Sequence, residues 1–119
     1  MKLSHKMTVK SAPAKVWAYL VEDDKFKVWN PDVIEAQDLD DLGVVAGARG
    51  RLLMKEGSGE CEYFTKLLEV EVEKTLSLQL TGKPLGKSPM YVHYKLTASS
   101  EGTVLEQETD WVPAELSLK

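Results

Sequence analysis

Residues 76–81 read Leu-Ser-Leu-Gln-Leu-Thr, and this regular alternation of apolar and polar side chains is the clearest structural signal in the chain. Successive side chains of a β-strand point to opposite faces of a sheet, so a period of two predicts a half-buried strand. Outward from this stretch, similar runs bounded by turn residues predict six further strands. They cover residues 2–10, 33–39, 48–55, 60–69, 92–96 and 105–111.

Helical spacing interrupts the strands near the start of the chain. Apolar residues over 13–21 recur at helical spacing, and a second short helix is expected over 23–30, ending before Pro31. We expect Trp17 to lie in the core and Trp29 to lie at the mouth of any cavity. The sequence therefore predicts one α+β domain over residues 1–119, with two short helices after the first strand and an antiparallel sheet of seven strands.

Composition narrows the class of protein. The chain has 119 residues, of which 43% are hydrophobic and 29% charged, and its net charge is −4. Its only arginines are Arg49 and Arg51, so nothing predicts the basic face of a nucleic-acid-binding domain. No apolar run reaches the roughly 18 residues of a membrane span. A single cysteine, Cys61, excludes an internal disulfide, and together with the polar amino terminus it predicts a cytoplasmic protein.

The motifs of common metal and nucleotide sites fail on spacing. The glycine-rich stretch 82–88 has one residue too few between its glycines for a phosphate-binding loop, and a proline follows it where a helix would be needed. His5 and His93 lack the partners of a zinc site, and the acidic stretch 38–41 lacks the glycine and glutamate of a calcium loop. We therefore expect no metal and no cofactor.

The inward parity of the strands is more informative than any motif. Polar side chains share this face with leucines and valines, and each buried polar group without a partner costs about 1–3 kcal/mol. They form either an internal hydrogen-bond network or a pocket that meets a ligand, and parity alone leaves both open. The residues predicted to line one concave face are Met54, Tyr63, Leu78, Tyr94, Gln107 and Thr109, whereas Arg51, Glu62 and Glu108 are expected on the opposite face.

Four stretches resemble a known superfamily in the right order along the chain. Ser11-Ala12-Pro13-Ala14-Lys15-Val16-Trp17-Ala18-Tyr19-Leu20 resembles the first helix of the START-like helix-grip proteins. Residues 24–31 are similar to their second helix, and residues 47–50 and 102–105 to two of their strand starts. The resemblance is strongest to the polyketide cyclase/dehydrase-like branch. It implies a strongly curved antiparallel sheet that grips a long carboxy-terminal helix, with an apolar cavity between them.

The resemblance also implies a range of functions, since a fold does not select one. Members bind lipids, polyketides, plant hormones or quinones. We therefore expect a small hydrophobic ligand in the concave cavity, bound by Trp29 together with the six lining residues. One alternative is a metal-free cyclase or dehydratase, for which only His5 with Tyr63 or Tyr94 offers an inward acid–base pair. The other is a protein-interaction module of the heat-shock-ATPase activator type.

The end of the chain departs from the superfamily pattern. Only residues 112–119 follow the last predicted strand, which is too short for the gripped helix. The expectation is a truncated chain or a partner that covers the sheet. The apolar side chains of that face predict a homodimer; they are Leu3, Val9, Leu76, Leu78, Leu80, Leu96, Leu105 and Trp111.

Overall fold

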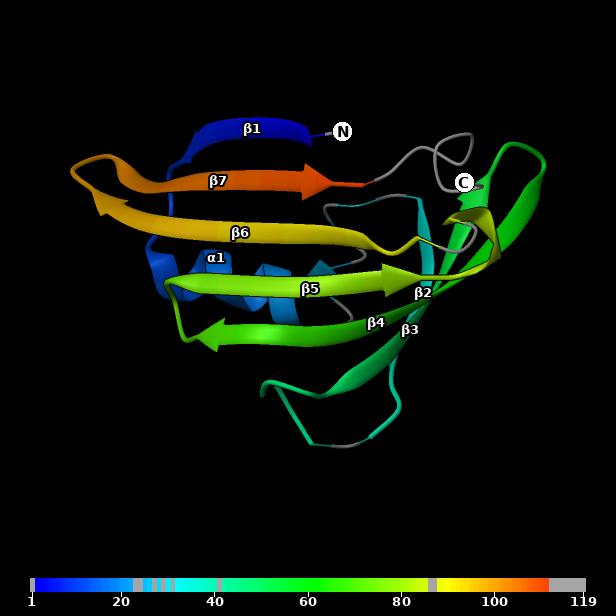
Figure 1. Ribbon diagram of the computed structural model, residues 1–119. Helices are drawn as coiled ribbons and strands as arrows, with labels where there is room; N and C mark the ends of the chain where they lie inside the picture. Colours follow the sequence, from blue (N-terminus) through cyan, green and yellow to red (C-terminus); the bar gives the residue numbers. More distant parts are fainter. Residues whose placement is uncertain are drawn as a thin grey trace.

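A computed structural model describes residues 2–22, 25, 26, 28, 30, 32–40, 42–85 and 88–111. Seven strands form one antiparallel sheet in the order β1-β7-β6-β5-β4-β3-β2 (Figure 1). The elements are β1 (Lys2–Val9), α1 (Pro13–Val21), β2 (Val33–Asp38), β3 (Arg49–Glu56), β4 (Gly59–Glu71), β5 (Thr75–Thr81), the short 3-10 helix η1 (Lys83–Leu85), β6 (Met90–Ser99) and β7 (Gly102–Asp110). The predicted α+β class and the seven antiparallel strands are confirmed.

The first of the two expected helices is α1, which begins at Pro13 and buries one apolar face. In the second segment the described residues Lys25, Phe26 and Val28 are helical, and the Phe26 N–H donates to the Glu22 carbonyl at 2.8 Å. Trp29 and the rest of that segment lie outside the described residues. The first expected helix is therefore confirmed, while the second stays a prediction supported by three helical residues.

The core lies where α1 packs on the concave face of the sheet. The buried cluster joins Val16, Trp17 and Leu20 of the helix to Leu76, Val92, Tyr94 and Leu96 of β5 and β6. Trp17 is only 8% exposed, which confirms the expected core position. The alternation first seen in residues 76–81 thus places its leucines under the helix.

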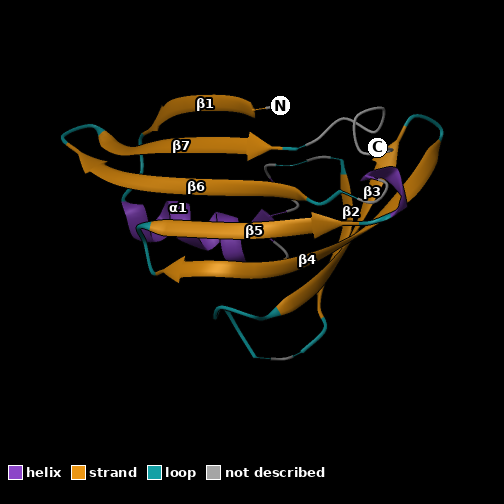
Figure 2. Cartoon of the chain, viewed as in Figure 1, coloured by secondary structure: helices purple, strands orange, loops and turns teal. Residues whose placement is uncertain are grey.

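The sheet is curved rather than flat. Strands β5, β6 and β7 run side by side, while β3 and β4 bend away from them (Figure 2). The register of β4 against β5 shifts between Leu67 and Glu69, and that of β2 against β3 shifts between Val33 and Glu35. Bulges of this kind bend a strand and increase its twist. The curvature opens a hollow on the face that α1 covers only in part.

The turn between β6 and β7 anchors the first strand to α1. Gly102 has a φ of 138°, and a Cβ at this position would lie 2.1 Å from the Val9 carbonyl oxygen. Next to it, the fully buried Thr103 donates its hydroxyl to the Ser11 carbonyl at 2.7 Å. These contacts fix the chain where β1 leads into the helix.

Candidate functional site

A cavity of about 620 Å³ occupies the concave face between α1 and strands β2 to β7. Most of the surface of its wall is apolar, and the aliphatic side chains that contribute to it include Leu20, Leu52, Leu78, Leu80 and Val92. Such a volume lies within the range of about 300–1,000 Å³ that small-molecule sites occupy.

The structure brings six of the seven predicted site residues to this one cavity: Met54, Tyr63, Leu78, Tyr94, Gln107 and Thr109. Strand register explains the grouping, because Leu78 pairs with Val92, which pairs with Thr109, and Tyr94 pairs with Gln107. Residues directly opposite each other in an antiparallel sheet share a face. The seventh residue, Trp29, lies outside the described residues.

The predicted outer set is divided. Glu62 and Glu108 are not part of the cavity wall. Arg51 does lie at the edge of the cavity, which differs from the expectation. Its guanidinium nevertheless forms ion pairs with Glu62 and with Glu35 on the neighbouring strands.

One end of the cavity holds a hydrogen-bonded cluster of Glu56, Cys61 and Tyr63. The Tyr63 hydroxyl donates to one oxygen of the Glu56 carboxylate, and the Cys61 thiol donates to the other at 3.1 Å. The Tyr63 and Cys61 hydrogen bonds lower the pKa of Glu56, in that order of importance. Burial and the hydrogen bond to Glu56 raise the pKa of Tyr63. The separate hydrogen bond from Cys61 to Glu56 raises the pKa of Cys61. At neutral pH the cluster is therefore an ionised carboxylate that accepts two protonated donors.

The other polar group comes from β6 and β7. Tyr94 is 7% exposed, and burial raises its pKa to about 12. Its hydroxyl makes no hydrogen bond with any residue that the structure describes. Within the same residues no fully enclosed polar side-chain atom lacks a partner, so this hydroxyl reaches open space in the cavity. Gln107 and Thr109 are half-buried and likewise form no side-chain hydrogen bond within the described part of the chain.

These observations separate the two alternatives left by the strand parity. Tyr63 belongs to an internal network, whereas Tyr94, Gln107 and Thr109 face the cavity with hydrogen-bonding capacity to spare. Neither histidine is part of the cavity wall. His5 is exposed on β1, and His93 is half-buried, with its Nδ1 at 2.8 Å from the Ser77 hydroxyl. The register pairs His5 with Gln107, so His5 shares the cavity face of the sheet, although it is exposed and is not part of the cavity wall.

Sequence reasoning missed Glu56 as a cavity residue. A usable signal existed, because Glu56 stands two residues after Met54 and so shares its face of β3. Cys61 is half-buried and pairs with Met54 across the hairpin. Its contact with Glu56 depends on how the hairpin closes, which strand parity does not report.

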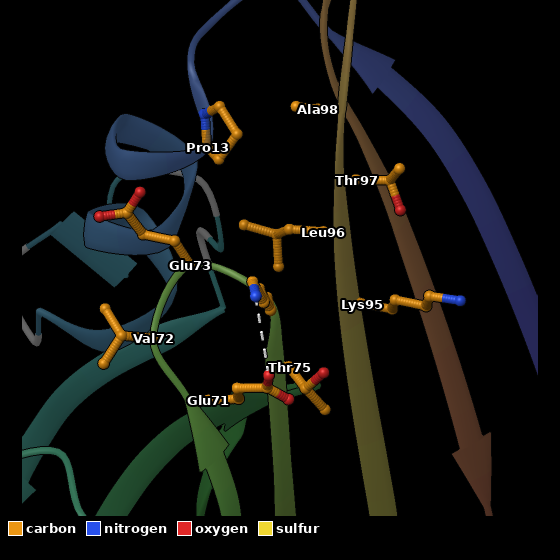
Figure 3. A pocket seen from close by; sticks show the side chains of 10 residues that line it. Pro13, Glu71, Val72, Glu73, Thr75, Lys95, Leu96, Thr97 and Ala98 are labelled. Atoms are coloured by element: carbon orange, nitrogen blue, oxygen red, sulfur yellow. Dashed lines mark ion pairs between the residues drawn. The ribbon is translucent and has the colours of Figure 1, made fainter.

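A second hollow of about 540 Å³ lies at the opposite end of α1 from the concave cavity, between Pro13, the β4–β5 turn and β6 (Figure 3). Leu96 points into it, whereas Lys95 and Thr97 point away (Figure 3). An ion pair of 3.9 Å joins Glu71 to Lys74 in the turn. The concave cavity is the candidate site, because it is the one that brings the predicted lining residues together.

The described residues offer neither a metal site nor a membrane-spanning helix. Among them, no group of three or more His, Cys, Asp or Glu side chains is arranged to hold a metal ion. No helix in the described ranges is long and apolar enough to cross a membrane.

The fold has clear structural relatives. The chain superposes on protein MLL2253 from Mesorhizobium loti with a TM-score of 0.76 and 19% identity, covering 97% of this chain and 79% of the other. For Ara h 8.0201 the TM-score is 0.76, the identity 15% and the coverage 99% and 85%. For protein CV1439 from Chromobacterium violaceum the TM-score is 0.79 and the identity 11%, and the match covers 97% of this chain and 82% of the other.

No protein-family model and no curated protein matches the chain. The structural likenesses, all at low sequence identity, establish the fold alone. They fit a helix-grip-type fold, with a curved antiparallel sheet around a central cavity.

Proposed function

We propose that this protein binds a small hydrophobic molecule, such as a lipid or polyketide, in the concave cavity. The observation that carries the proposal is the cavity itself, whose wall combines a largely apolar surface with a few polar groups that have no partner among the described residues. Apolar walls supply affinity, and a few polar groups orient the ligand. Met54, Tyr63, Leu78, Tyr94, Gln107 and Thr109 are the proposed contacts, with Trp29 at the mouth.

A matched pair of variants tests this proposal. Met54 and Leu53 are neighbours on β3 whose side chains lie on opposite faces, and only Met54 lines the cavity. We expect Met54→Trp to weaken binding of the neutral dye N-phenyl-1-naphthylamine by about tenfold, because the indole fills the space. Leu53→Trp is the control and leaves binding unchanged. Fluorescence titration provides the affinities, and equal effects of the two variants would contradict the proposal.

A metal-free cyclase or dehydratase is the second candidate, and the Glu56–Tyr63 pair favours it. An ionised carboxylate beside the cavity can accept a proton from a carbon next to a carbonyl, while the Tyr94 hydroxyl can donate to the carbonyl oxygen. The proton leaves the carbon for Glu56, and the electron pair moves into the enolate. Proton–deuterium exchange of a β-diketone, followed by NMR, should then depend on Glu56 and disappear in Glu56→Gln.

The interaction-module alternative and the homodimer depend on apolar surface outside the cavity. Leu3 and Met7 on the edge strand β1 are 62% and 46% exposed. We propose that a second copy covers them.

The cytoplasmic location remains a prediction from the single cysteine, and the polyketide cyclase-like branch remains a prediction from the sequence motifs.

A further inference from the structure

Both arginines at the edge of the cavity are neutralised by carboxylates. Arg49 donates from Nε and from a terminal nitrogen to the two oxygens of Asp40, at 3.1 and 2.8 Å. Arg51 is paired with Glu62 and, at 3.6 Å, with Glu35. None of the cavity residues that the structure describes is a lysine. The described wall therefore offers no free cation to an anionic ligand.

The cavity does hold a carboxylate without a cationic partner. Glu56 accepts hydrogen bonds from Tyr63 and Cys61, both uncharged, and forms no ion pair within the described part of the chain. Its charge is therefore uncompensated at the wall. Because Glu56 is itself exposed, solvent reduces the repulsion that it exerts but does not remove it.

Strands β6 and β7 carry hydrogen-bonding groups of the cavity that have no partner among the described residues, and these groups are all neutral. The Tyr94 hydroxyl and the Gln107 amide stand opposite each other in register, and Thr109 lies two residues further along β7. A phenol, an amide and a hydroxyl can donate to and accept from an uncharged group. They cannot compensate a carboxylate that has left water.

We propose that the cavity selects uncharged amphiphiles, molecules with an apolar body and one hydroxyl or carbonyl group held by Tyr94 and Gln107, and discriminates against carboxylates such as fatty acids. This inference rests on the proposed ligand binding and adds the chemical class of the ligand. The selectivity comes from a like charge at Glu56 and from the absence of a compensating cation in the described wall.

The test compares two probes that share one hydrocarbon chain, 1-decanol and decanoate, as competitors of N-phenyl-1-naphthylamine at pH 8. We expect the protein to bind 1-decanol at least about tenfold more tightly than decanoate, because burying an unpaired carboxylate next to another carboxylate is costly. Tyr94→Phe should weaken the binding of 1-decanol by about threefold to tenfold, which is the effect of one lost hydrogen bond. Its control is Tyr91→Phe, because Tyr91 lies on the opposite face of β6.

A charge variant isolates the role of Glu56. Glu56→Gln should strengthen decanoate binding severalfold and leave the affinity for 1-decanol within about twofold of that of the unmodified protein. Glu60→Gln removes the same charge from the same hairpin at an exposed position outside the cavity wall. It should change neither the affinity for decanoate nor the affinity for 1-decanol.

The outcomes distinguish the selectivity from the binding itself. If the dye binds and decanoate competes as well as 1-decanol, the selectivity is wrong and the hydrophobic site stands. The same conclusion follows if Glu56→Gln and Glu60→Gln behave alike. If neither the dye nor 1-decanol binds, the proposed function is wrong and the selectivity falls with it.

Discussion

Tyr94 shows how one residue joins stability to function. Its ring belongs to the core beneath α1, while its hydroxyl faces the cavity without a partner in the described part of the chain. Because the hydroxyl reaches open space in the cavity, it is available to hydrogen-bond a ligand there. The residue therefore marks the place where a polar group of the ligand is expected.

The raised pKa of Tyr94 predicts a pH dependence of stability. Burial holds the phenol in its neutral form with a pKa of about 12, above the value of about 10 in the unfolded chain. The folded state therefore binds more protons between these values, and the free energy of unfolding should fall as pH rises through this window. The loss amounts to about 2–3 kcal/mol at most.

Urea unfolding at pH 9 and pH 11.5 measures this loss. Tyr94→Phe should show a smaller decrease than the unmodified protein, while the outer-face control Tyr91→Phe should keep the full decrease. An equal decrease in all three proteins would show that Tyr94 does not titrate in this range.

At the scale of elements, the β6–β7 turn and the bulges give the sheet its shape. Thr103 ties β7 to the segment before α1, and the bulge near Leu67 bends β4 so that the sheet curves around the cavity. The helix supplies one wall and the bent strands supply the others. The site therefore depends on connections between elements as much as on the residues that line it.

Gly102 provides a test of this arrangement. A side chain here meets both an unfavourable φ and the backbone of Val9 and Ser11, so Gly102→Ala should destabilise the fold by about 1–3 kcal/mol or more. Gly59→Ala is the control, because a Cβ there lies 3.9 Å from the nearest atom and φ is not positive. Thermal unfolding should show a clear decrease for the first variant and little change for the second.

At the scale of the whole molecule, α1 covers more of the apolar face than the sequence indicated. Leu76 and Leu96, expected to need a partner, are 2% and 5% exposed within the core. Among the described residues, the uncovered part lies at the edge of the sheet, where β1 pairs with β7 and exposes Leu3 and Met7. Exposed apolar residues at a strand edge are a frequent site of association.

We therefore expect a twofold dimer at micromolar concentration, formed through β1. Sedimentation equilibrium should show the dimer for the unmodified protein and a monomer for the double variant Leu3→Lys, Met7→Lys. The control Ser4→Lys, Thr8→Lys adds the same charge to the opposite face of the strand. A monomer free of bound lipid in the unmodified protein would contradict this expectation.

The sequence by itself determined the elements and the faces of this protein. The leucines of residues 76–81 and the positions of Met54, Tyr63, Tyr94 and Gln107 follow from a period of two, because parity assigns each side chain to one side of a sheet. Trp17 follows from helical spacing in the same way. Periodicity is local, so it survives without knowledge of the neighbouring strands.

Only the tertiary structure decided which polar groups find partners. Hairpin closure brings Glu56 to Tyr63 and Cys61, and loop closure brings Asp40 to Arg49, while Tyr94 is left with a free hydroxyl in the described structure. Hydrogen bonds need atoms within about 3 Å of each other, and ion pairs need them within about 4 Å. Such proximity depends on sheet curvature and on bulges, which the alternation of apolar and polar residues does not encode.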